Sequence, residues 1–111
     1  MDLYQELQDK IKQLEISLKE LRNSGTKYAQ AEKDYKVLLR QECLKLRDEG
    51  MAIGMIDKTC YGIPCVAEAR FNRDVAEAVY RANMEAINSI KLQMRLIENQ
   101  LSREWNVSDK V

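Results

Sequence analysis

A cluster of charged residues at helical spacing is the first feature of the sequence that could do chemistry. Its members are Arg70, Arg73, Asp74, Glu77 and Arg81. Residues three and four apart share one face of a helix, so these acidic and basic groups can pair within the helix or act together as a polar docking surface. Two interpretations therefore stand: a solvated face of intrahelical pairs, and a surface that binds a protein partner. Both can hold at once.

The three cysteines offer little catalytic chemistry. Cys60 and Cys65 lie close together across a turn, with Asp57 nearby, and Cys43 lies further upstream. The sequence contains no histidine, which is the commonest general base and the commonest metal ligand. The pair also lacks the further ligands that a zinc site needs. We therefore expect no catalytic residues, no metal and no cofactor, and we expect these cysteines to pack as small apolar side chains.

Three tyrosines, Tyr28, Tyr35 and Tyr80, carry rings that could stack on a nucleobase or a nucleotide. Their positions in the heptad pattern favour packing between helices, with the hydroxyl groups directed outward. A small-molecule or nucleotide sponge, with its pocket between protomers, is therefore the weaker functional hypothesis.

A long helix must carry the N-terminal part of these residues. Apolar residues there alternate in spacings of four and three: Leu7, Ile11, Leu14, Leu18 and Leu21. That alternation indicates a coiled-coil seam, and its phase continues past Gly25 as far as Leu46. We predict a helix over residues 2–49, either continuous and bent near Gly25 or divided there by a hinge.

Local signals mark where this helix ends and the next begins. Gly50 suits the left-handed residue that commonly ends a helix. Residues 50–63 form a connector with one short helical turn, and Pro64 suits the first position of a second helix over residues 64–105. The polar tail at residues 106–111 is expected to fray.

The second helix carries two apolar stripes. With the first helix it forms a predicted hairpin seam made of Leu18, Gly25, Tyr28, Tyr35, Tyr80, Ile87, Ile90, Met94 and Ile97. A second stripe, which we assign to oligomer contacts or packing, consists of Phe71, Val75, Val79, Ala82 and Ala86. A helix with so wide an apolar face covers more than one neighbour, so either the connector or a second protomer covers this stripe. The seam phase places Tyr35 opposite Tyr80.

These elements predict a single all-α domain over residues 1–111. Its fold is a long, coiled-coil-like antiparallel helical hairpin with a short structured connector. Two helices in a chain of 111 residues bury only one stripe each, which leaves little core for a lone protomer. We therefore predict a homo-oligomer, a dimer or a higher assembly.

Residues 46–73 allow a different function, because their glycine and apolar spacing is typical of a helix-turn-helix DNA-binding unit. In that interpretation Arg70, Asn72 and Arg73 face the major groove. Acidic residues interleave with the arginines, and the chain balances 18 Lys and Arg against 18 Asp and Glu. Nucleic-acid binders usually carry a segregated positive face. Nucleic acid is therefore the less favoured partner.

The N-terminal residues have neither the basic region nor the apolar run of a targeting segment. No apolar stretch approaches the roughly 20 residues that span a bilayer. We expect a cytoplasmic protein that does not contact a membrane.

Charged and aromatic helical patterns occur at residues 31–36 (AEKDYK), 66–77 (VAEARFNRDVAE) and 103–105 (REW). On these stretches the chain resembles small helical proteins encoded by phages and prophages of Gram-positive bacteria, over residues 26–105. The resemblance implies a viral origin and action in the cytoplasm of the host cell. It also implies an accessory factor or an inhibitor of host machinery, including antiviral defence. It carries no catalytic or ligand residues over to this chain.

The sequence therefore favours a non-enzymatic helical interaction protein with an unidentified protein partner. We expect docking on the polar face between Arg70 and Arg81, together with the connector. Arg73 and Asn83 support this hypothesis, because a polar residue on a helical seam commonly sets register or partner choice.

Overall fold

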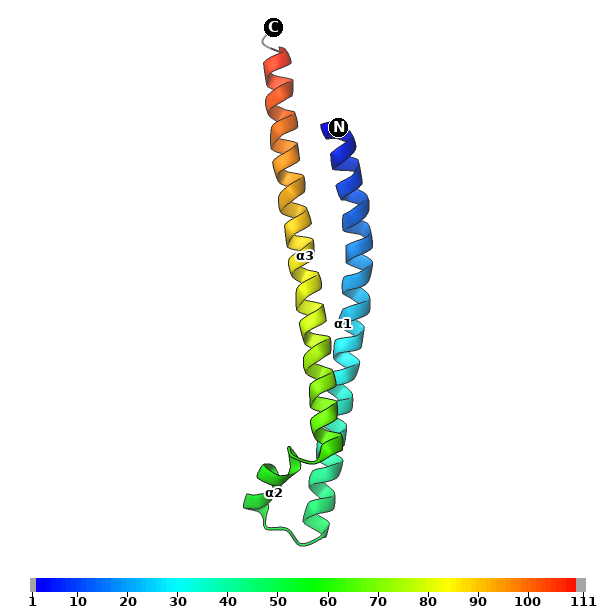
Figure 1. Ribbon diagram of the computed structural model, residues 1–111, viewed down its shortest axis with the longest axis vertical. Coiled ribbons are helices and arrows are strands. Elements are labelled where there is room, and N and C mark those ends of the chain that lie inside the picture. Colours follow the sequence, from blue (N-terminus) through cyan, green and yellow to red (C-terminus); the bar gives the residue numbers. More distant parts are fainter. Residues whose placement is uncertain (1, 110–111) are drawn as a thin grey trace. The chain divides into compact units, whose positions relative to one another are not determined.

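The described residues of the chain form three helices. The structure is a computed structural model that describes residues 2–109, and the side chains of residues 108 and 109 are not described. The helices are α1 (Leu3–Asp48), α2 (Ile53–Cys60) and α3 (Pro64–Asp109), as Figure 1 shows. The predicted all-α helical hairpin is confirmed, and α1 passes through Gly25 without interruption.

The chain divides into two compact units. Residues 1–23 and 81–111 form the terminal unit, and residues 24–80 form the connector unit. Within each unit, a segment of α1 packs antiparallel against a segment of α3 (Figure 1). The connector unit also contains all of α2.

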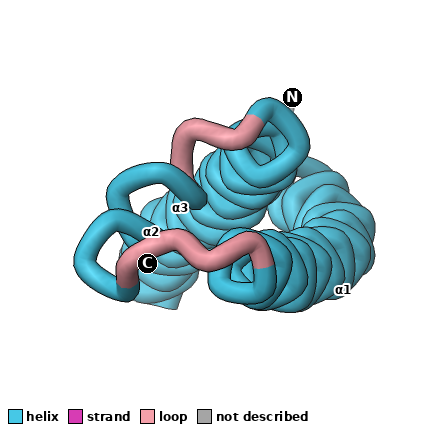
Figure 2. Tube along the Cα trace, turned by 90° about the horizontal axis from the view of Figure 1, so that it is seen from below, coloured by secondary structure: helices cyan, strands magenta, loops and turns pink. Residues whose placement is uncertain are grey.

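The end of α1 and the start of α3 lie where Gly50 and Pro64 predict them. Gly50 has a φ of 90°, and its N–H bonds to the Arg47 carbonyl while the Met51 N–H bonds to the Leu46 carbonyl. These two bonds form a Schellman motif, which needs a residue that tolerates positive φ. Pro64 is the first residue of α3, where its missing N–H costs nothing. Short loops flank α2 on both sides (Figure 2).

The C-terminal end of α3 differs from the prediction. The helix continues to Asp109, so the expected fraying of the tail is wrong for residues 106–109, and residues 110–111 lie outside the described part. Because no glycine or proline follows Pro64, nothing in the local sequence stops the helix at Trp105. Trp105 is exposed and does not close the hairpin.

The α3 side of the seam is confirmed in both units. Its predicted positions are buried or half-buried: Tyr80, Ile87, Ile90, Met94 and Ile97. Across the described residues the buried hydrophobic side chains are few: Tyr35, Ile56, Cys60, Val66, Ile87 and Ile90. The core is therefore a narrow line of contacts between helices.

The α1 side of the seam keeps Gly25, Tyr28 and Tyr35, which are half-buried or buried, and departs from the prediction at Leu18. Leu18 is 38% exposed, so its predicted place in the seam is wrong. Ser17, next to Leu18, is half-buried, and Ser24, next to Gly25, is buried. Small side chains let two helices approach closely, and Gly25 shows how closely, since a Cβ atom there would lie 3.1 Å from Cε1 of Tyr80.

The pairing of α1 with α3 in the connector unit is displaced by one heptad from the predicted register. Tyr80 packs against Tyr28, with ring centroids 5.9 Å apart, rather than against Tyr35. Tyr35 instead lies under the guanidinium of Arg73, 4.6 Å from its ring centroid.

Helix α2 accounts for this displacement. It packs against the last turns of α1, where the Cys60 thiol donates a hydrogen bond to the Leu39 carbonyl over 3.5 Å. Residues of both helices line a groove of about 290 Å³: Arg40, Cys43, Leu44, Arg47, Ile53, Ile56 and Asp57. Because α2 occupies this end of α1, α3 can pair only with positions further upstream.

Candidate interaction surface

The second apolar stripe lies open on α3. Phe71 is 62% exposed, Val75 46% and Val79 50%, and Ala82 and Ala86 are exposed as well. Of the two coverings that the sequence allowed, the connector does not provide one, because α2 packs against the end of α1. The stripe is thus an apolar face with no covering element in the described chain.

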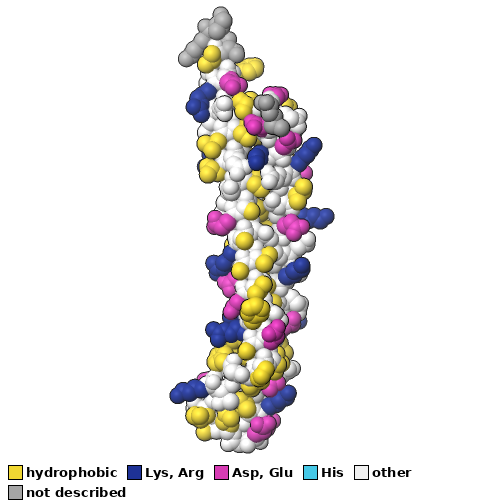
Figure 3. Space-filling view, viewed as in Figure 1, with side chains coloured by type: hydrophobic (Ala, Val, Ile, Leu, Met, Phe, Trp, Pro, Cys, Tyr) yellow, Lys and Arg dark blue, Asp and Glu magenta, His cyan; other side chains and the backbone are white. Residues whose placement is uncertain are grey.

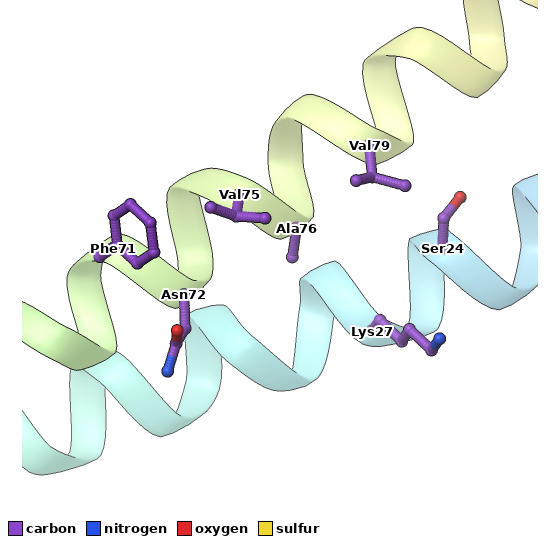
Figure 4. Close-up of a pocket in the computed structure, with 7 residues that line it drawn as sticks. All are labelled: Ser24, Lys27, Phe71, Asn72, Val75, Ala76 and Val79. Carbon is purple, nitrogen blue, oxygen red and sulfur yellow. The ribbon is translucent and has the colours of Figure 1, made fainter.

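A groove runs beside the N-terminal half of this stripe, inside the connector unit. Its volume is about 310 Å³, and Figure 4 shows residues of both helices along it. The lining residues are Phe71, Asn72, Val75, Ala76 and Val79 from α3, with Ser24 and Lys27 from α1. Apolar side chains predominate, and the amide of Asn72 and the ammonium of Lys27 add polar groups. Such a groove suits the apolar side of another helix.

Arg73 belongs to packing rather than to a free polar surface. Its guanidinium lies over the ring of Tyr35, and its Nε and Nη2 atoms donate hydrogen bonds of 3.0 and 2.8 Å to Oδ1 of Asp74. The bond to Asp74 raises the pKa of Arg73, against the opposing effect of burial. The seam position of Arg73 in the sequence indicated that it lies between the helices, and the structure identifies Tyr35 as its aromatic partner.

The other members of the charge cluster separate. Arg70 lies 5.9 Å from the ring centroid of Tyr61, beside the turn that leads into α3. Asp74 and Arg81 are exposed and Glu77 is half-buried; Glu77 and Arg81 also have interactions of their own. The five predicted docking residues therefore do not form one uniform surface. Arg73 and Asp74 pair directly, and Arg70 contacts the connector.

The three residues of the DNA-binding alternative also separate. Arg73 stacks on Tyr35 of α1, Asn72 lines the apolar groove, and Arg70 lies at Tyr61. Lys and Arg side chains alternate with Asp and Glu over the face seen in Figure 3. A recognition helix needs several side chains free to enter one groove of the duplex. This arrangement argues against that function.

We predict that binding to random duplex DNA stays undetectable at low salt. A positive face of several lysines or arginines would bind and then lose affinity steeply as salt rises, because bound counterions are released. Fluorescence anisotropy with a labelled duplex, titrated at rising salt concentrations, measures this directly. Tight binding at low salt with a steep salt dependence would restore the DNA-binding alternative.

The tyrosines do not form an open stacking platform. Tyr28 and Tyr80 pack on each other with an interplanar angle of 34°, and Tyr35 is buried. Their rings serve the seam, so the nucleotide-sponge hypothesis receives no support from them.

The residue pair that sequence reasoning missed is Cys43 with Cys60. The Cys43 thiol donates to Sγ of Cys60 over 3.0 Å, which joins α1 to α2. Cys60 is fully buried, as predicted, whereas Cys65 is exposed, so its predicted packing role is wrong. No spacing rule links positions 43 and 60, because the contact depends on where α2 docks.

Within the described residues, no cluster of three or more His, Cys, Asp or Glu side chains could hold a metal ion. No helix in that part is both long and apolar enough to cross a bilayer. Comparison with protein families, with curated proteins and with solved structures gives no match to this chain.

Proposed function

We propose that the chain is a non-enzymatic helical interaction protein that docks another helix on the exposed stripe of α3. The uncovered face of Phe71, Val75 and Val79, beside the groove in the connector unit, carries this proposal. Soluble proteins seldom leave a contiguous apolar face of this kind without a use for it. The groove is lined mainly by apolar side chains, which suits the apolar face of a helix.

The occupant is α3 of a second copy of the chain. The side chains of the stripe are large at its N-terminal end and small at its C-terminal end: Phe71, Val75 and Val79 are followed by Ala82 and Ala86. An antiparallel copy places large residues against small ones, which fills space without collision. The stripe is thus self-complementary, as a two-fold interface requires.

The sequence sets the position of the two-fold axis between Ala78 and Val79. Phe71 then faces Ala86 of the partner subunit, and Val75 faces Ala82 of the partner subunit. Burying one Phe or Val side chain contributes on the order of 1.5–3 kcal/mol. In a dimer, each of these side chains is buried in both copies. Over the three side chains of both copies, the sum exceeds the roughly 4–15 kcal/mol that association costs in lost freedom, but only by a modest margin. We therefore expect a dissociation constant near micromolar rather than nanomolar.

We predict that Val75→Glu weakens self-association by roughly 100-fold or more, since an apolar contact would have to bury an unpaired carboxylate on each side. Sedimentation velocity or light scattering across a concentration series measures the shift. Val37→Glu is the matched control, because Val37 on α1 is 48% exposed and does not line the groove. Circular dichroism should show equal helix content in both variants.

A cross-link tests the axis itself. In a Cys65→Ser background, Val79→Cys should form a disulfide between two copies under mild oxidation, whereas Val37→Cys should not. A wild-type chain that stays monomeric at roughly 100 µM would overturn the self-docking proposal. A monomer that binds a different protein through the same stripe would keep the interaction function and replace the occupant.

The phage resemblance suggests the setting in which such a module acts. Arg70 and Arg81 are exposed beside the stripe, so a dimer would still present them to a protein of the host. Action as an accessory factor or an inhibitor of host machinery is the role we propose on that basis. Arg70→Glu combined with Arg81→Glu should then reduce partner capture and leave dimerisation unchanged.

A further inference from the structure

Two thiols meet where α2 docks on α1. Sγ of Cys43 and Sγ of Cys60 are 3.0 Å apart, about 1 Å longer than the covalent disulfide bond of about 2.05 Å. The two cysteines belong to different helices and lie 17 residues apart in the chain. A small side-chain movement therefore suffices to join them.

We propose that Cys43 and Cys60 are a site of reversible oxidation, and that they close to an intramolecular disulfide when the reduced protein meets a low-molecular-weight disulfide such as oxidised glutathione. Cys43 is half-buried while Cys60 is fully buried. Only Cys43 of this pair is open to a reagent from solution. It is the entry point, and Cys60 is the resolving thiol.

The reaction proceeds in two exchanges. The Cys43 thiolate attacks one sulfur of the glutathione disulfide, forms a mixed disulfide and releases one glutathione thiol. The Cys60 thiolate then attacks Sγ of Cys43, forms the internal disulfide and releases the second glutathione thiol. The protein loses two protons and two electrons, and the glutathione disulfide gains both.

The setting of Cys60 makes the second exchange slow near neutral pH. Burial, the hydrogen bond from Cys43 and the charges of Glu42 and Asp57 raise the pKa of Cys60 to about 12. The thiolate is the nucleophile, so closure should accelerate about tenfold for each unit of pH between 7 and 9. The pair stays reduced in a reducing compartment and responds to sustained oxidation.

Closure would hold α2 on α1. Ala52 at the start of α2 makes no side-chain capping bond, and a helix of 8 residues is unstable without tertiary contacts. Joining Cys43 to Cys60 removes conformations of the unfolded loop between them. Oxidation should therefore slow hydrogen exchange in α2 and raise the midpoint of thermal unfolding.

Peptide mapping tests the proposal on the full chain. The reduced protein is incubated with oxidised glutathione at pH 8, alkylated and digested with trypsin. We expect a loss of two hydrogens, and the peptides Gln41–Lys45 and Thr59–Arg70 joined by a reducible link. The Cys65→Ser variant is the matched control, because it removes the exposed thiol and should leave this link intact.

A link between Cys60 and Cys65, a covalent dimer through Cys65 alone, or two thiols that stay free would each overturn the proposal. Cys43→Ser should abolish the link and the shift in hydrogen exchange. If this variant does not fold, the peptide map of Cys65→Ser decides, since that variant leaves only one internal pairing for Cys60.

Discussion

Replacing Tyr35 with alanine should lower the free energy of unfolding by about 3–5 kcal/mol, the usual cost of removing a large buried aromatic side chain. Tyr35 is among the few buried hydrophobic residues and also supports the guanidinium of Arg73. Urea denaturation followed by circular dichroism measures the loss. Tyr35→Phe keeps the ring and should cost about 1 kcal/mol or less.

A double-mutant cycle separates the ring's packing from its contact with the guanidinium. Arg73→Met keeps a long apolar stem but removes the charge, and its combination with Tyr35→Ala closes the cycle. We expect a coupling energy of about 0.5–2 kcal/mol, because the pair is partly desolvated. A coupling energy of zero would mean that Arg73 contributes only through Asp74.

The substitution Val66→Asp should have the second of the two largest effects. Val66 is fully buried at the start of α3, and an unpaired carboxylate placed there costs several kcal/mol. We expect a loss of about 4 kcal/mol or more, which approaches the total stability of a small domain. Thermal unfolding of the purified variant measures it.

Ala67→Asp is the control for Val66→Asp, because Ala67 is the next residue on the same helix and is exposed. It adds the same charge and should cost about 0.5 kcal/mol or less. Alkylation gives a local readout: Cys60 should stay protected in the control and react rapidly in Val66→Asp. Equal protection of Cys60 in both variants would contradict the buried placement of Val66.

Helix ends and the seam of α3 were predictable from the sequence because their causes are local. Gly50 supplies the positive φ that a Schellman motif needs, and Pro64 suits the first position of a helix. The alternation that leads through Ile87 and Ile90 depends only on the 3.6-residue turn of α3. The open stripe was recognised for the same reason, as a second face of one helix.

The tertiary structure decided which residues meet across the helices. A shift of one heptad returns apolar positions to apolar positions, so the sequence pattern suits Tyr80 opposite Tyr28 as well as opposite Tyr35. The docking of α2 against the end of α1 selected the first pairing. The same docking event placed Cys60 beside Cys43. These contacts depend on where the short helix α2 docks, and the apolar periodicity of the sequence does not predict that position.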